Sequence, residues 1–153
     1  MHFVRAYSHH NGRDQWRDRE LDEWLTDVFE KPELIVGPGS TTAIRDHVKA
    51  EFAVEGWGYD VKVDQQVDLT VFGTKDDLGF QLQTGNISRA AYDLLKLQHL
   101  YSAERIEAAG LALPTKEAAT RIGSNIANFE RVMNELSLFN RTITVPIFLV
   151  AFE

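Results

Sequence analysis

Asp68, Gln81 and Gln83 are three polar side chains whose spacing could bring them together on neighbouring strands. The two glutamines alternate with apolar residues in "GFQLQTGN" (79–86), which is the pattern of a strand that buries one face. Asp68 lies in the preceding β-rich stretch, "VKVDQQVDLTVFG" (61–73), and "TKDD" would join the two as a hairpin connection. Opposite side chains of adjacent antiparallel strands lie about 5 Å apart, so we expect the aspartate and both amides to share one face.

An aspartate on one strand and an acid-x-lysine or acid-x-glutamine pair on the next could support metal-dependent hydrolysis of a phosphodiester. The aspartate and the second acid would hold Mg²⁺ through oxygen ligands. The third residue would position the attacking water, while the metal would stabilise charge on the phosphate. The pattern Asp-x12-Gln-x-Gln is weak by itself, because an ordinary solvated face of a hairpin has the same composition.

Composition limits the classes of protein to which the chain could belong. Its 153 residues are 44% hydrophobic and 25% charged, as in globular proteins, and no apolar run approaches the ~18–20 residues of a membrane span. The start "MHFVRAYSHH" lacks the basic-then-apolar layout of a secretory signal. The absence of cysteine excludes disulfides and thiolate metal sites, and it fits a cytoplasmic protein.

Sixteen basic and 23 acidic residues give a net charge of −7. Taken alone, this charge argues against a nucleic-acid partner, because phosphate binding needs clustered lysines and arginines. A local basic face can nevertheless coexist with acidic surroundings, and clustered carboxylates can hold cations.

The chain has no internal repeat, low-complexity tract or linker-like stretch, so we expect one domain over 1–153. Strands are predicted at 2–9, 61–73, 78–84, 105–114 and 143–153. Helices are predicted at 14–31, 41–54 and 86–102, followed within 114–139 by a short helical stretch and a helix capped by Ser124. Pro146 suggests an edge position or a bulge for the last strand. The order predicts a mixed α/β (α+β) fold in which helices flank a mixed β-sheet.

The stretch "GNISR" (85–89) opens the helix that follows the glutamine strand. Its backbone N–H groups and helix dipole would suit a phosphate, which makes Asn86, Ser88 and Arg89 candidates for DNA contact. A simple helix cap with a surface arginine is the alternative. Lys96, two helical turns further on, is expected to be structural or solvated.

The stretch "GPGSTT" (37–42) allows the same two interpretations. Ser40 and Thr41 either cap the next helix or also reach a backbone phosphate. The histidines of "SHHNG" (8–12) are expected at a solvated strand end, because adjacent side chains of a strand point to opposite faces and cannot easily bind one ion.

Several of these segments together resemble a known family. "VDLTVFG" and "LGFQLQTGN", followed by a long helix, resemble the core of the PD-(D/E)XK nucleases, and more narrowly the BglII/BstYI-like type II restriction endonucleases. "VGPGSTTAIRDHVKAEF", Trp57 and the late "VPIFLV" strand are similar to further parts of that family, so the resemblance runs from about position 36 to 152. It implies a restriction-endonuclease-like fold and Mg²⁺- (or Mn²⁺-) dependent cleavage of double-stranded DNA by a homodimer at palindromic sites.

By this resemblance, Asp68 would bind the metal, Gln81 would occupy the position of the second metal ligand, and Gln83 would match the family's glutamine. The family has a glutamate where this chain has Gln81. An uncharged amide is a much poorer ligand for Mg²⁺, so cleavage is expected to be weakened or lost. Either the amide was introduced to stop cleavage, or the chain is naturally a weak or inactive relative.

Two other interpretations remain open at this point. The chain could be a non-catalytic DNA-binding or interaction protein on a nuclease scaffold, or an unrelated mixed α/β domain with a polar hairpin. DNA cleavage by a Gln81→Glu variant would distinguish the nuclease from a non-catalytic DNA-binding protein. Metal titration of Asp68→Ala against the parent would distinguish it from an unrelated α/β domain.

Overall fold

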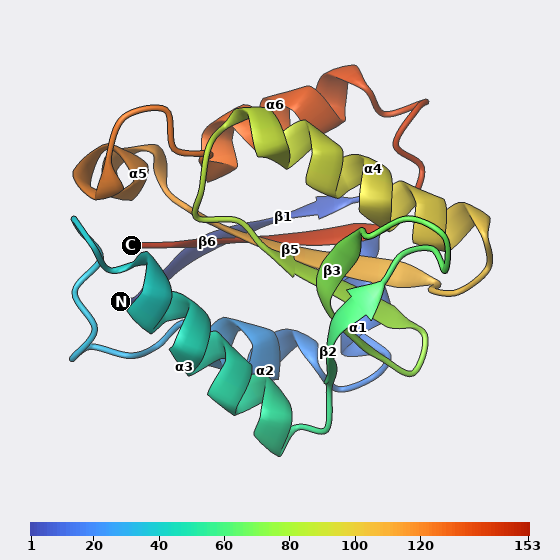
Figure 1. Ribbon diagram of the computed structural model, residues 1–153, viewed down its shortest axis with the longest axis horizontal. Helices are drawn as coiled ribbons and strands as arrows, with labels where there is room; N and C mark the ends of the chain where they lie inside the picture. The colour runs from blue at the N-terminus through green and yellow to red at the C-terminus, as the bar shows by residue number, and fades with distance from the viewer.

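A six-stranded mixed sheet forms the centre of the computed structural model, which describes all residues, 1–153 (Figure 1). Its strands are β1 (Phe3–His9), β2 (Gly58–Lys62), β3 (Thr70–Lys75), β4 (Leu78–Leu82), β5 (Ala108–Pro114) and β6 (Ile147–Phe152). Their order across the sheet is β1-β6-β5-β4-β3-β2. β4, β5 and β6 pair in parallel, and the remaining pairs are antiparallel. The predicted mixed sheet is therefore confirmed.

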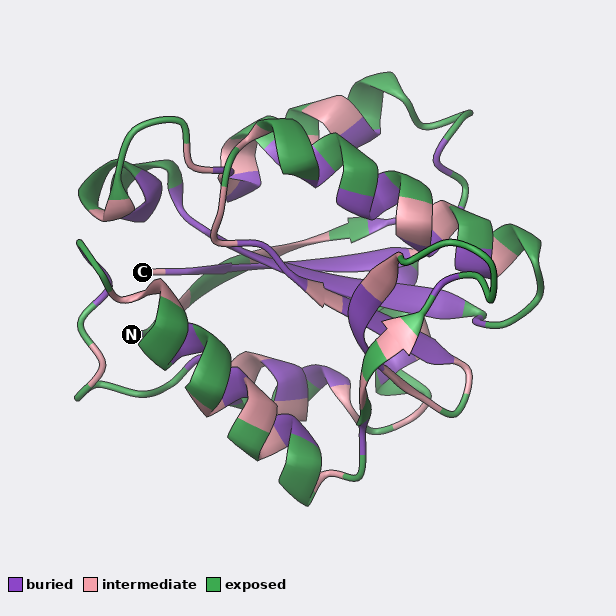
Figure 2. Ribbon diagram, in the orientation of Figure 1, coloured by how far each residue is buried: buried purple, intermediate pink, exposed green.

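Six helices surround this sheet: α1 (Gly12–Arg17), α2 (Asp22–Asp27), α3 (Thr41–Val54), α4 (Ser88–Ser102), α5 (Lys116–Ile122) and α6 (Phe129–Leu138). Figure 1 shows α4 and α6 over one face and α1, α2 and α3 over the other. The core is accordingly divided into two clusters of buried side chains, one on each face, and the middle strands between them are buried throughout (Figure 2). None of the helices combines the length and the apolar character that crossing a membrane requires.

The closing strand has an interior position, so the prediction from Pro146 is wrong. β6 lies between β1 and β5, and all its residues are buried. Pro146 comes directly before the first strand residue, Ile147, where its missing N–H removes no bond from the ladder. Its carbonyl still accepts a hydrogen bond from the N–H of Ala109, at 2.8 Å.

The helix predicted over 14–31 is two short helices, α1 and α2. The chain turns between them, and Glu20 adopts a left-handed conformation with φ 58°. Trp16 and Leu25 would lie on opposite sides of one continuous helix, yet both are fully buried. The turn allows both side chains to face the core.

The β-rich stretch 61–73 is also divided, because β2 ends at Lys62 and β3 begins at Thr70. Between them, the carboxylate of Asp64 accepts a hydrogen bond from the N–H of Gln66 at 2.7 Å, a local bond that favours a turn over a strand. Asp68 therefore precedes β3 and is not a strand residue, contrary to prediction.

The remaining elements follow the predictions with three corrections. The hairpin turn between β3 and β4 consists of Asp76 and Asp77 alone, not of the four residues "TKDD". Asn128, not Ser124, caps α6, because its side chain accepts a hydrogen bond from the N–H of Arg131 at 3.1 Å. His9 is not solvated: it is 3% exposed at the end of β1.

Candidate active site

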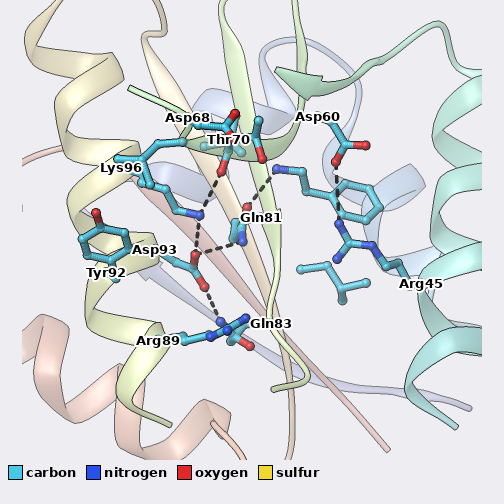
Figure 3. Close-up of a pocket in the computed structure, with 14 residues that line it drawn as sticks. Arg45, Asp60, Asp68, Thr70, Gln81, Gln83, Arg89, Tyr92, Asp93 and Lys96 are labelled. Atoms are coloured by element: carbon cyan, nitrogen blue, oxygen red, sulfur yellow. Dashed lines mark hydrogen bonds and ion pairs between the residues drawn. The ribbon is translucent and has the colours of Figure 1, made fainter. Parts of the chain in front are cut away.

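A cleft of about 540 Å³ opens where β3 and β4 separate, between α3 and α4 (Figure 3). The paired residues of the two strands run from Lys75–Leu78 to Gly73–Phe80. Beyond the last pair, the side chains of Gln81 from β4 and Lys96 from α4 contact the backbone of β3. The cleft contains all three residues that the sequence predicted to come together, which are Asp68, Gln81 and Gln83.

The tip of this hairpin is held by Arg19, which follows α1. Its Nε donates to Oδ1 of Asp77 at 2.8 Å, and its terminal nitrogen donates to Glu107 at 2.8 Å. The hydrogen bonds and charge of Arg19 lower the pKa of the Asp77 carboxyl. This contact joins the hairpin turn to the residue before β5 and so fixes the end of β4 that is remote from the cleft.

Gln81 bridges a strand and a helix through the two ends of its amide. Its Oε1 accepts a hydrogen bond from the backbone N–H of Phe72 at 2.8 Å, and its Nε2 donates to Oδ1 of Asp93 at 2.9 Å. The amide therefore replaces a backbone partner for β3 where the ladder ends, and it also contacts α4.

Gln83, two residues further along the chain, makes an equivalent pair of contacts with a backbone N–H and with Asp93. Its Oε1 accepts a hydrogen bond from the N–H of Gly85 at 2.7 Å, and its Nε2 donates to Oδ2 of Asp93. Gln83 is 6% exposed. Both glutamines thus direct their NH₂ groups to one carboxylate.

Asp93, which the sequence prediction did not include, is the centre of this site (Figure 3). It lies on α4, is 3% exposed and accepts hydrogen bonds from both glutamines. Lys96, one turn further along α4, places Nζ 2.7 Å from Oδ1 of Asp93 and donates to the carbonyl of Thr70 at 2.9 Å. The sequence predicts Lys96 to be structural or solvated, and these contacts make it structural, with a side chain that is only 12% exposed.

Asp68 lies at the rim of the cleft and is exposed. It forms no hydrogen bond or ion pair within the chain, in contrast to Asp93. Asp60, another acid of the cleft, lies 3.7 Å from the guanidinium of Arg45, which also packs over the ring of Phe72. Asp68 is therefore the free carboxylate of the site.

These donors do not fit a Mg²⁺ site in the observed arrangement. The amide oxygens of Gln81 and Gln83 both accept backbone N–H groups, and both oxygens of Asp93 accept hydrogens from its three partners. Asp68 would be the single anionic ligand, whereas hard cations require several oxygen donors around one point. No group of three or more histidine, cysteine, aspartate or glutamate side chains in the chain could hold a metal ion.

The candidate DNA-contacting residues lie at two helix starts. At α4, the side chain of Asn86 accepts hydrogen bonds from the N–H and the hydroxyl of Ser88 at 2.9 and 2.8 Å, which is a local turn before the helix, and no side chain caps α4 at its N-cap, Ile87. Arg89 is exposed and lines the cleft. At α3, the hydroxyl of Ser40 donates to the carbonyl of Gly37 at 2.7 Å, and Ser40 and Thr41 lie outside the cleft.

The comparisons with known proteins agree with this fold. The family Restriction endonuclease BglII/BglIII matches residues 4–152. The fold is similar to that of restriction endonuclease BglII complexed with a DNA 16-mer, with a TM-score of 0.75 and 14% identity over 99% of this chain and 76% of that chain. Free BglII gives a TM-score of 0.74 and 14% identity over 100% of this chain and 80% of that chain. No curated protein matches the chain. Because the family match covers nearly the whole chain, this protein belongs to the BglII/BglIII restriction endonuclease family.

Proposed function

We propose that this chain binds double-stranded DNA across the cleft and that its metal-dependent cleavage of phosphodiester bonds is weak or absent. The observation that carries the proposal is the meeting of Asp68, Gln81 and Gln83 in one cleft of a restriction-endonuclease fold. The similarity to BglII in complex with DNA supports double-stranded DNA as the partner.

The roles follow the family resemblance, with one change. Asp68 has the position of the family's metal-binding aspartate, and Gln83 has the position from which water would be oriented. Gln81 occupies the position of the catalytic glutamate, and its neutral amide is turned to Asp93. The loss of this charge is the proposed cause of weak cleavage.

Phosphate contacts are proposed for the two helix starts beside the cleft. Arg89 supplies the charge and lines the cleft, while Asn86 and Ser88 supply polar groups at the same helix end. Ser40 and Thr41 are proposed to contact the backbone on the α3 side. A homodimer would place two such clefts on the two strands of a palindromic site. A cytoplasmic location is part of the same proposal.

The second candidate is a DNA-binding protein without catalysis on this scaffold. The specific observation in its favour is that Gln81, Gln83 and Asp93 satisfy one another without a metal. The two candidates share DNA binding and differ only in cleavage.

The test compares the parent with Gln81→Glu and with the double variant Gln81→Glu/Asp93→Asn on supercoiled plasmid and on linear duplex DNA at low salt. The double variant returns a carboxylate to the strand, and the amide introduced at position 93 can donate to it, so like charges do not meet. We expect the parent to shift duplex DNA in EDTA and to nick it feebly or not at all in Mg²⁺ or Mn²⁺. We expect nicking from the double variant, and less from Gln81→Glu.

Asp68→Ala, added to the double variant, is the control and should abolish the nicking. A parent that does not bind duplex DNA would contradict both candidates. DNA binding without nicking by either glutamate variant would leave the non-catalytic candidate and reject the nuclease.

A further inference from the structure

The floor of the cleft contains a buried ion pair that the family resemblance does not predict. The side chains of Asp93 and Lys96 are 4% and 12% exposed, and Nζ of Lys96 lies 2.7 Å from Oδ1 of Asp93. The same ammonium donates to the carbonyl of Thr70 at 2.9 Å. Lys96 therefore binds two oxygen acceptors from two different elements, α4 and the start of β3, as a bound cation would.

Backbone contacts fix the orientation of both glutamine amides, so that their NH₂ groups face Asp93. The N–H of Phe72 requires an acceptor and so holds the oxygen of Gln81, which leaves the NH₂ group of Gln81 for Asp93. The N–H of Gly85 fixes the oxygen of Gln83 in the same way, and the NH₂ group of Gln83 also faces Asp93. A glutamate at position 81 would place an oxygen where Nε2 now lies, 2.9 Å from Oδ1 of Asp93. Two carboxylates at that distance repel one another.

The amide at position 81 is therefore complementary to its surroundings. The cleft floor still has a carboxylate, but α4 supplies it at position 93 and Lys96 neutralises it within the chain. This complementarity favours the natural origin of Gln81 over an introduced substitution, because Asp93 and Lys96 fit the glutamine and would not fit a glutamate alone.

We propose that the ammonium of Lys96 is the resident cation of this cleft and that it occupies the place of a divalent metal. Paired with Asp93 and bound to the carbonyl of Thr70, it satisfies the oxygens at the cleft floor and leaves Asp68 alone at the rim. The chain consequently takes no Mg²⁺ or Mn²⁺ at the cleft. Removal of the ammonium frees Asp93 and creates a divalent-cation site there.

This inference goes beyond the proposed function and does not depend on DNA as the ligand. Its test uses the full chain without DNA and follows Mn²⁺ binding by electron paramagnetic resonance and calorimetry. The variants are Lys96→Met, which keeps the length of the side chain without the charge, and Lys96→Met/Asp93→Asn. Lys75→Met is the matched control, because Lys75 lies 2.6 Å from Glu55 in a comparable ion pair and does not line the cleft.

We expect no stoichiometric Mn²⁺ site in the parent or in Lys75→Met. We expect one site in Lys96→Met, with an affinity at least about tenfold above that of the parent, and its loss in Lys96→Met/Asp93→Asn. If Lys96→Met is unfolded in EDTA, Mn²⁺ should restore its near-UV circular dichroism, because metal binding is coupled to folding.

Two results would overturn the inference. One is a Mn²⁺ site in the parent that disappears in Asp68→Ala or Asp93→Asn. The other is a Lys96→Met chain that gains no Mn²⁺ site when folded, or is not refolded by Mn²⁺ when unfolded. A failure of the proposed function would appear instead as a lack of duplex DNA binding, which these titrations do not measure.

Discussion

Oδ1 of Asp93 on α4 lies 2.9 Å from Nε2 of Gln81 on β4, so a partly buried hydrogen bond joins the helix to the strand at the floor of the cleft. The same carboxylate binds Gln83 and Lys96. A buried acid with three donors is a stability element as well as part of a site, since each donor requires it as an acceptor.

Asp93→Ala is expected to lower the free energy of unfolding by about 3–5 kcal/mol, because the ammonium of Lys96 and two amide groups lose their acceptor inside the protein. Asp93→Asn keeps one acceptor oxygen, so its free energy of unfolding is expected to decrease less than that of Asp93→Ala. Urea unfolding followed by circular dichroism measures both values. An Asp93→Ala chain as stable as the parent would show that water satisfies these groups.

Arg89→Gln is expected to weaken binding to duplex DNA, because Arg89 is an exposed cation that lines the cleft. One lost phosphate contact should reduce the slope of log affinity against log salt by about 1. Arg141→Gln removes the same charge from an exposed loop position outside the cleft and serves as the control. Fluorescence anisotropy over a salt series measures both slopes, and equal effects of the two variants would place the DNA elsewhere.

The sequence predicts α3 well because its apolar side chains repeat with a helical period, and it predicts β5 and β6 from their short apolar runs. Helix α3 spans the predicted residues 41–54, and its stripe of Ile44, Val48 and Phe52 is fully buried. The division of 61–73 does not follow from the sequence pattern, since the bend depends on a local hydrogen bond of Asp64 within a stretch that otherwise has strand composition.

The sequence predicts the site in part: it identifies Asp68, Gln81 and Gln83 but not Asp93, and the omission of Asp93 has a physical explanation. On α4 the buried positions are Ala90, Asp93, Leu94, Leu97 and Leu100, while the apolar Leu95 is 54% exposed. The prediction assumes that a charged residue faces solvent. The sequence signal for a buried acid on α4 is the pair of uncharged amides, Gln81 and Gln83, because two NH₂ groups at a cleft floor need an acceptor. This signal does not identify Asp93, because the contact between the glutamine segment and α4 is tertiary and does not follow from either segment alone.

Gly12→Ala is expected to destabilise the protein by about 3 kcal/mol or more, because a Cβ at Gly12 would lie 2.1 Å from the backbone carbon of Ile147. Backbone atoms of the central strand β6 cannot move aside without disturbing the sheet. Gly37→Ala is the control, since its Cβ would meet no atom within 4 Å. Thermal unfolding of both variants should separate them clearly, and similar melting temperatures would mean that α1 shifts freely on the sheet.

Asn128→Ala is expected to reduce stability by about 1 kcal/mol, because it removes the side-chain acceptor for the N–H of Arg131 at the start of α6. Ser124→Ala tests the position that the sequence favours as the cap. Ser124 is exposed and makes no side-chain hydrogen bond, so its replacement should leave the free energy of unfolding unchanged. A larger loss for Ser124→Ala than for Asn128→Ala in urea unfolding would reverse this assignment of the cap.

His9 is expected to make stability depend on pH. Burial lowers the pKa of His9 below its ordinary value of 6.5, and its ring Nε2–H donates to the carbonyl of Ile143 at 2.7 Å. The unfolded chain therefore takes up a proton at a higher pH than the folded chain does. Stability is fully present above the ordinary pKa and decreases as the pH falls from there through the lower pKa of the folded state.

His9→Gln keeps a hydrogen-bond donor but cannot titrate, so its melting temperature should vary less than that of the parent between about pH 7 and 5. The neighbouring His10, which is exposed and donates to the carbonyl of Asn140, provides the control His10→Gln, and this variant should keep most of the parent's dependence on pH. Differential scanning fluorimetry across this range measures the three profiles. A His9→Gln profile parallel to that of the parent would assign the pH dependence to other groups, among which the amino terminus of Met1 is a candidate, since burial lowers its pKa from 8.0 and this also makes stability decrease as the pH falls.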